Sequence, residues 1–221
     1  MAEKPQAGVF GLGTMGGGIA AALSEKEFDI FGLEPVAAGI SAARARAALA
    51  GFTIVSDPAA LVAVLRPPRR LLMMVPAGDP LDTQIAALRP HLAPGDVLID
   101  GGNSHFDDTA RRASGLGGSG IHYLGCGILG GERGARDGAS VMARGAKEGF
   151  EAARDMLEAI AAADDRGACC GWFGEGGAGH FVKMVHNGIE YAVMQAIGEA
   201  WLFLRDGLGF DAEAIARQVD H

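Results

Sequence analysis

The sequence predicts an α/β fold with a Rossmann-like, doubly wound and mostly parallel sheet, followed by the first helices of an all-α domain. Three observations support this prediction. Short apolar runs alternate with helical patterns up to about residue 124, glycine-rich turns separate them, and a long helical pattern begins at His180. Such alternation is typical of parallel strands joined by crossover helices. We expect two domains, residues 1–178 and residues 179–221.

Each element of the first domain follows from a local pattern. Short apolar runs predict strands at 8–12, 29–33, 52–55, 71–75, 97–100 and 121–124. Helical periodicity predicts helices at 14–24, 36–50, 81–92 and 107–113. A further helix begins after Asp57, because Pro58 suits a first helical position that needs no N–H donor.

The chain after residue 124 contains two glycine-rich stretches and longer helical patterns. We expect residues 125–138 to form a loop and residues 171–179 to form a linker. Helices are predicted at 148–162 and 180–208. Asp211 is expected to cap the start of one more helix.

Composition limits the function classes. The chain has 221 residues with a net charge of −8, which argues against a surface that binds nucleic acid. Hydrophobic residues make up 49% and charged residues 21%, so the chain is not disordered. The uncharged run 5–24 is too rich in glycine for a membrane span or a signal peptide. We therefore expect neither a nucleic-acid partner nor a membrane partner.

The cysteines indicate a reducing compartment. Cys126, Cys169 and Cys170 have no spacing that suits a zinc site, and they number three. We expect free thiols in a cytoplasmic protein and no bound metal.

A GxGxxG motif follows the first predicted strand. Gly11 permits a tight turn, Gly13 lets the backbone approach a pyrophosphate, and Gly16 lets helix and strand pack closely. Thr14 and Met15 open the helix, whose N-terminus favours phosphate. The motif predicts a dinucleotide site, although a purely structural turn would also use these glycines.

Glu34 ends the second predicted strand and bears on the choice of cofactor. A carboxylate there can accept hydrogen bonds from the adenosine ribose and would repel a 2′-phosphate. The first arginine to follow is Arg44. We therefore favour NAD over NADP, the alternative being that Glu34 is only a solvated strand end.

A polar stripe runs along the helix predicted from His180. Its members lie three and four residues apart, within an arc of about 140°, and are Lys183, His186, Asn187, Glu190 and Tyr191. A lysine can take a hydroxyl proton if burial or a nearby positive charge lowers its pKa. The alternative is a solvated face with a Lys183–Glu190 or Lys183–Asn187 pair.

Three motifs together resemble the 6-phosphogluconate dehydrogenase family. They are the GxGxxG motif, the run Asp100-Gly101-Gly102-Asn103-Ser104, and the stripe at 183–191. The resemblance covers nearly the whole chain. Residues 74–78 are also similar to the loop that lies beneath the nicotinamide in that family.

The resemblance implies oxidative decarboxylation of 6-phosphogluconate to ribulose 5-phosphate and CO2. Lys183 would accept the C3 hydroxyl proton, and Glu190 would protonate C1 of the enediol. The sugar-acid phosphate would be held by Asn103, Gly130, Gly131, His186, Asn187 and Tyr191. The cofactor would be contacted by Val75, Pro76, Ala77 and Asn103, besides the GxGxxG residues and Glu34.

The sequence departs from the family pattern in several places. Leu129 stands where the family usually has serine, so one hydroxyl contact is missing. The family's Met-Pro-Gly-Gly is replaced by Met142-Ala143-Arg144-Gly145. Family members continue through an all-helical domain that forms a homodimer, whereas this sequence stops at His221. We expect a truncated chain that binds the dinucleotide but turns over poorly.

Two other functions stay open. A dehydrogenase of 3-hydroxyacids such as hydroxyisobutyrate shares the GxGxxG motif and the catalytic lysine, but lacks the 100–104 run and the His186–Tyr191 continuation. A non-catalytic NAD-binding module would explain Leu129 and the short second domain.

Overall fold

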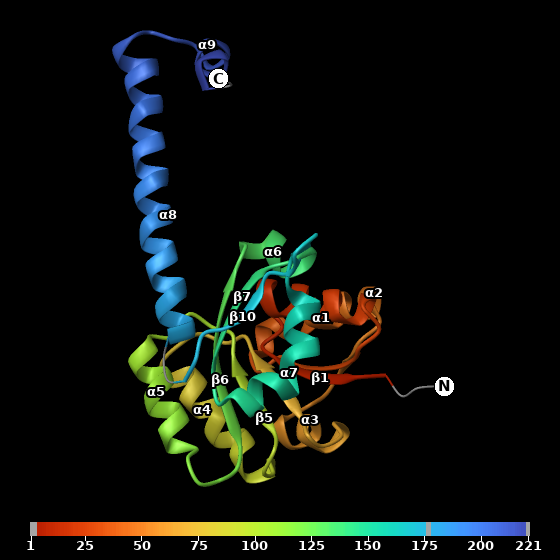
Figure 1. Ribbon diagram of the computed structural model, residues 1–221. Coiled ribbons are helices and arrows are strands. Elements are labelled where there is room, and N and C mark those ends of the chain that lie inside the picture. Colours follow the sequence, from red (N-terminus) through yellow and green to blue (C-terminus); the bar gives the residue numbers. More distant parts are fainter. Residues whose placement is uncertain (1–3, 176–177, 220–221) are drawn as a thin grey trace. The chain divides into compact units, whose positions relative to one another are not determined.

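The computed structural model describes residues 4–175 and 178–219. They form two compact units, a larger one that ends at Lys183 and a smaller one that begins at Met184 (Figure 1). The predicted domain boundary after residue 178 stays a prediction.

An eight-stranded sheet organises the larger unit, in the order β10-β7-β6-β5-β4-β1-β2-β3. The parallel strands are β1 Gln6–Phe10, β2 Asp29–Leu33, β3 Thr53–Ile54, β4 Arg70–Met73, β5 Val97–Asp100 and β6 His122–Leu129. Strand β7 Ser140–Gly145 is antiparallel to β6, and β10 Cys170–Trp172 is parallel to β7. The order reverses between β1 and β4, and ligands of doubly wound sheets bind at such a point.

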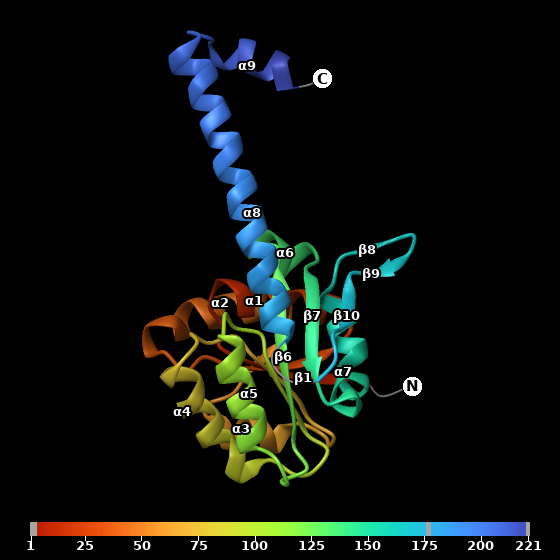
Figure 2. The ribbon, with the colours of Figure 1, turned by 60° about the vertical axis from the view of Figure 1, so that its left-hand side comes forward.

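Helices cover both faces of this sheet (Figure 2). They are α1 Thr14–Glu25, α2 Ile40–Ala50, α3 Pro58–Val64, α4 Asp79–Leu88, α5 Phe106–Gly115, α6 Gly131–Asp137 and α7 Lys147–Ile160. One core packs α1, α2 and α7 against the sheet through side chains such as Ile19, Ala43 and Phe150. The other packs α3 and α4 through Leu61 and Leu81. The predicted doubly wound fold is confirmed.

The expectation of a loop at 125–138 is wrong. Strand β6 continues to Leu129, and α6 occupies Gly131–Asp137. In β6, Gly125 and Gly127 alternate with the buried Cys126, so a strand pattern of period two was hidden by glycine. The glycines lie on the face where another backbone comes close, which is a position that favours glycine in strands.

Several element boundaries also differ from the prediction. Strands β7, β8 Ala163–Asp164, β9 Gly167–Ala168 and β10 were not predicted. The linker expected at 171–179 is shorter, because β10 occupies its start and α8 begins at Ala178; residues 176–177 lie outside the described residues. The helices expected at 36–50 and 81–92 each include a short 3-10 turn, at Ala37–Gly39 and Arg89–His91.

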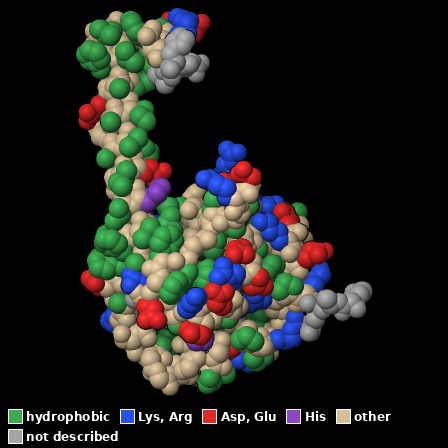
Figure 3. Space-filling model, in the orientation of Figure 1, with side chains coloured by type: hydrophobic (Ala, Val, Ile, Leu, Met, Phe, Trp, Pro, Cys, Tyr) green, Lys and Arg blue, Asp and Glu red, His purple; other side chains and the backbone are tan. Residues whose placement is uncertain are grey.

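The smaller unit continues α8, which spans Ala178–Leu202, and adds a π-helical turn at Phe203–Gly207 and α9 Ala212–Val219. The Asp211 carboxylate accepts a hydrogen bond from Ala214 N at 2.8 Å, which confirms the predicted cap. Hydrophobic side chains such as Ile189, Val193 and Ile197 are exposed along α8 (Figure 3). Within the described residues, we find no helix with the length and apolar character of a membrane span.

Asp96 provides a test of the larger unit's stability. Its buried carboxylate accepts hydrogen bonds from Arg69 N at 2.7 Å, Ala93 N at 2.8 Å and Arg69 Nη1 at 3.0 Å. Asp96→Ala should lower the free energy of unfolding by about 3 kcal/mol or more, because it leaves the Arg69 guanidinium without its carboxylate partner and two amides unpaired. Asp164→Ala, which removes the exposed pair with Arg166, should cost less than about 1 kcal/mol. Urea denaturation of both variants checks this, and equal midpoints would contradict it.

Candidate active site

The turn after β1 contains three glycines, and a side chain would have a different effect at each of them. Gly11 has a φ of +89°, and its amide donates to Leu33 O at 2.8 Å. A Cβ at Gly16 would lie 1.9 Å from Gly11 O, so α1 can pack on the turn only without a side chain there. A Cβ at Gly13 would meet nothing within 4 Å. The space beside Gly13 suits a bound pyrophosphate.

The N-terminus of α1 supplies donors at this turn. Gly13 is its N-cap and no side chain caps the helix. Thr14 is exposed and Met15 is half-buried. The first N–H groups of a helix have no partner within it, and with the helix dipole they favour a phosphate. The turn therefore fits the phosphates of a dinucleotide.

Glu34 lies at this turn and is buried, so it is not a solvated strand end. Its Oε2 accepts from Leu12 N at 2.7 Å and its Oε1 accepts from Val36 N at 2.9 Å. From α2, Arg46 Nη1 donates to Leu12 O at 2.7 Å. The peptide groups of Leu12 are thus held from both sides. No local sequence pattern points to Arg46, because its side chain reaches the turn only when α2 folds back over α1.

The loop after β4 lies beside the turn that carries Asn103. Val75 is buried, whereas Pro76 and Ala77 are exposed. A Cβ at Gly102 would lie 3.0 Å from Val75 O, so the two segments are in close contact. The structure therefore brings the predicted cofactor loop and Asn103 to one edge of the sheet.

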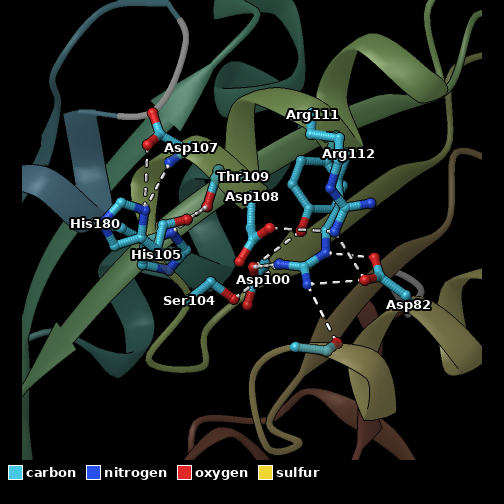
Figure 4. A network of polar contacts seen from close by, with 12 residues as sticks. Asp82, Asp100, Ser104, His105, Asp107, Asp108, Thr109, Arg111, Arg112 and His180 are labelled. Atoms are coloured by element: carbon cyan, nitrogen blue, oxygen red, sulfur yellow. Dashed lines mark hydrogen bonds and ion pairs between the residues drawn. The ribbon is translucent and has the colours of Figure 1, made fainter.

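Arg112 of α5 joins these two segments (Figure 4). It is 4% exposed, and it donates to Gly78 O at 3.2 Å, Ser104 Oγ at 3.2 Å and Asp82 Oδ1 at 2.8 Å. Hydrogen bonds from Arg112 and Arg111 hold the pKa of Asp82 down at about 2. No local spacing in the sequence predicts this contact of Arg112.

Asp100 shapes the Asn103 turn from inside. It is fully buried at the end of β5, and its Oδ1 accepts from Gly102 N at 3.1 Å. Its Oδ2 accepts from Tyr123 Oη at 2.9 Å and lies 3.7 Å from Arg112 Nη1. Burial raises the pKa of the Tyr123 hydroxyl. Because both carboxylate oxygens face the protein, Asp100 supports the turn from within.

Lys183 meets Asn103 at the same edge of the sheet. Its Nζ donates to Asn103 Oδ1 at 2.7 Å. Burial lowers the pKa of Lys183, while the nearby Cys126 and Asp100 act in the opposite direction. A lysine with a lowered pKa is neutral more often at a given pH, and only the neutral amine can accept a proton.

Glycines of β6 allow Lys183 to reach this place. A Cβ at Gly127 would lie 2.8 Å from Lys183 Cβ. A Cβ at Gly179 would lie 2.6 Å from Gly125 O. The first turn of α8 therefore lies directly against the backbone of β6. The G-x-G spacing in the strand is the signal that could have predicted this contact, had the segment not been assigned to a loop.

His180 is a further buried residue of this turn, and no pattern in the sequence singles it out. It is 3% exposed, and its Nδ1 lies 2.8 Å from Thr109 Oγ1 of α5. It precedes Lys183 by one helical turn and so belongs to the same edge of the site.

The remaining predicted residues are placed as follows. Gly130 and Gly131 have φ values of +124° and +59° where β6 turns into α6. The other members of the polar stripe lie on α8 in the smaller unit, namely His186, Asn187, Glu190 and Tyr191. His186 Nδ1 is 3.8 Å from Glu190 Oε2. The substrate and acid roles of all these residues stay predictions. Residues 4–175 and 178–219 contain no His, Cys, Asp and Glu cluster suited to a metal.

The two glycines of the dinucleotide turn can be separated by experiment. Gly13→Ala should leave the urea midpoint nearly unchanged, because its Cβ points into open space, but should weaken NAD binding at least about tenfold. Gly16→Ala should destabilise the fold as well, because its Cβ would overlap Gly11 O. Calorimetric titration with NAD and urea denaturation measure the two effects. Unchanged NAD affinity in Gly13→Ala would contradict the site.

Comparison with known proteins places this geometry in a family. Residues 6–174 match the model described as the NAD binding domain of 6-phosphogluconate dehydrogenase, and residues 179–220 match that of its C-terminal domain. The chain therefore carries an NAD(P)-binding domain.

Curated relatives agree with the family models. The chain is 43% identical to the decarboxylating 6-phosphogluconate dehydrogenase of Haemophilus ducreyi, over 96% of this chain and 44% of that protein. It is 40% identical to the NADP(+)-dependent decarboxylating enzyme of Bacillus subtilis, over 96% and 45%. The chain thus spans a little under half the length of these relatives.

Solved structures agree as well. The 6-phosphogluconate dehydrogenase of Plasmodium falciparum, studied with NADP+ and with 6-phosphogluconate, superposes with a TM-score of 0.89 at 31% identity, over 96% of this chain and 46% of that one. A 3-hydroxyisobutyrate dehydrogenase of Mycobacterium tuberculosis, at 23% identity and a TM-score of 0.80, over 96% and 69%, shares the fold. The chain belongs to the 6-phosphogluconate dehydrogenase family.

Proposed function

We propose that this chain supplies the cofactor domain and the catalytic lysine for the NAD-dependent oxidative decarboxylation of 6-phosphogluconate to ribulose 5-phosphate and CO2. The observation that carries the proposal is the Lys183–Asn103 hydrogen bond of 2.7 Å, at the sheet edge that also holds the dinucleotide turn. A base beside the cofactor loop is what an alcohol oxidation needs.

Lys183 acts first as a base and then as an acid. Its neutral Nζ accepts the C3 hydroxyl proton, and Asn103 Oδ1 holds the amine in place for this transfer. The C3 hydrogen would leave as hydride, with bound NAD supplying the acceptor. The C3 ketone lets the C1–C2 electron pair pass into an enediol as CO2 leaves, and the Lys183 ammonium returns its proton to the keto oxygen.

The last step requires a second acid. In our proposal Glu190 protonates C1 of the enediol, which yields ribulose 5-phosphate. As the family resemblance implies, we propose substrate-binding roles for His186, Asn187 and Tyr191 of α8, and also for Gly130 and Gly131 after β6. Leu129 offers no hydroxyl to the substrate, so these side chains hold it without the usual serine contact.

Glu34 supports NAD as the preferred cofactor. Its carboxylate is buried at the dinucleotide turn, and a 2′-phosphate near it would be repelled. The nearby Arg46 guanidinium donates to the carbonyls of Leu12 and Gly13 at 2.7 and 3.4 Å. These two hydrogen bonds hold the Arg46 guanidinium at the turn. The Bacillus subtilis relative is described as NADP(+)-dependent, so we propose that the preference differs within the family.

The cofactor preference can be measured directly. NAD should bind at least about tenfold more tightly than NADP, which corresponds to about 1.4 kcal/mol. Glu34→Gln should narrow this ratio, because it removes the charge that repels the 2′-phosphate. Glu148→Gln, an exposed change of the same charge, should leave it unaltered. Calorimetric titration with both dinucleotides decides the matter, and tighter NADP binding by the unmodified chain would overturn the preference.

The chemical step can be tested under single-turnover conditions. The chain in excess, with NAD and C1-labelled 6-phosphogluconate, should form NADH and labelled CO2 slowly but in equal amounts. Lys183→Met should lower the rate by about 10² to 10⁴, as expected for loss of a general base. Lys4→Met, far along the chain on an exposed residue, should not change it. NADH without CO2 would instead indicate a hydroxyacid dehydrogenase. Tight NAD binding without any product would indicate a non-catalytic module.

A further inference from the structure

We propose that His180 is a positioning residue, which fixes the Lys183 amine against Asn103 by joining the first turn of α8 to α5, the helix that begins just after the Asn103 turn. The inference rests on the proposed function only for the role of the lysine. The positioning itself is a property of the larger unit and can be observed without turnover.

His180 is attached to α5. Its Nδ1 lies 2.8 Å from Thr109 Oγ1, and Thr109 Oγ1 also donates to His105 O at 3.1 Å. A Cβ at Gly125 would lie 2.4 Å from Thr109 Cγ2 and 3.1 Å from His180 Nδ1. The pair therefore fits on β6 only because that position is glycine. With the hydroxyl hydrogen on His105 O, the imidazole Nδ1–H is the donor to Thr109.

The imidazole also lies beside the turn that carries Asn103. The backbone carbonyls of Asp100 and Gly102 favour its protonated form. Burial outweighs them and lowers the pKa of His180. Nε2 is buried and has no hydrogen-bond partner among the described residues, so the hydrogen bond with Thr109 is what holds the ring.

These contacts form a closed circuit. His180 is bonded to Thr109 of α5, which begins three residues after Asn103; Asn103 accepts from Lys183, and Lys183 follows His180 by one helical turn. Asp100 and Lys183 act on the pKa of His180, and Cys126 and Asp100 act on the pKa of Lys183. A neutral imidazole closes the circuit without placing a second cation beside the Lys183 amine.

Two pairs of substitutions separate positioning from bulk stability. His180→Phe keeps a ring but removes the hydrogen bond with Thr109, whereas His180→Asn keeps an amide near the position of Nδ1. Thr109→Val removes the hydroxyl and Thr109→Ser retains it. Thr83→Val is the matched control, because Thr83 Oγ1 also donates to the carbonyl four residues earlier, at 2.9 Å, but has no histidine partner.

The readout is the titration of Lys183 in the whole chain, followed by NMR of ¹³C-labelled lysine. His180→Phe and Thr109→Val should raise the Lys183 midpoint by about half a pH unit or more, because the loosened turn exposes the amine to water. His180→Asn, Thr109→Ser and Thr83→Val should stay within about a quarter of a unit of the unmodified chain.

The opposite pattern overturns the inference. If His180→Phe and Thr109→Val lower the unfolding midpoint but leave the Lys183 titration in place, His180 is only a structural residue. Should His180→Phe fail to fold, Thr109→Val and Thr109→Ser still distinguish a positioning role of His180 from a purely structural one. A chain that releases no CO2 would contradict the proposed function and leave this titration test intact.

Discussion

The close approach of α8 to the backbone of β6 is the constraint on which the site depends. Gly125 and Gly127 leave one face of the strand without side chains, and Gly179 meets it from the helix. Only at this distance does the lysine one turn later reach the Asn103 amide. The same contact withdraws Lys183 from water, which lowers its pKa. The close packing of α8 on β6 therefore accounts both for the position of the Lys183 amine and for its lowered pKa.

A network of buried polar side chains holds the loop after β4 and the turn that carries Asn103 in fixed positions relative to each other. Arg112 links the loop after β4 to the segment after Asn103, and Asp100 holds the turn between them. Such a network needs every member satisfied, since an unpaired buried charge is costly. At the turn after β1, Glu34 and Arg46 hold the Leu12 peptide groups in a comparable way. Both arrangements place rigid protein behind the backbone groups that we propose for ligand binding.

Sequence patterns were sufficient for strands β1 to β5 and for the dinucleotide turn, because both follow from local residue spacing. Strands β1 to β5 follow apolar runs, and Gly11 and Gly16 follow from backbone geometry. Strand β7 could not be predicted, because its antiparallel pairing depends on contacts distant in the chain. The strand character of Gly125 and Gly127 was missed because glycine interrupts the alternation of apolar side chains that marks a strand. Arg46, Arg112 and His180 act through tertiary contacts that no local pattern encodes.

The most direct test of this account is the titration of the Lys183 amine in the unmodified chain, with the Gly127→Ala variant beside it. The account predicts a midpoint below the ordinary lysine value of about 10.4. It also predicts a rise towards that value when a Cβ at position 127 pushes the helix away from β6. A Lys183 midpoint at the ordinary value in the unmodified chain, unchanged by Gly127→Ala, would contradict the claim that close packing on β6 prepares the lysine for catalysis.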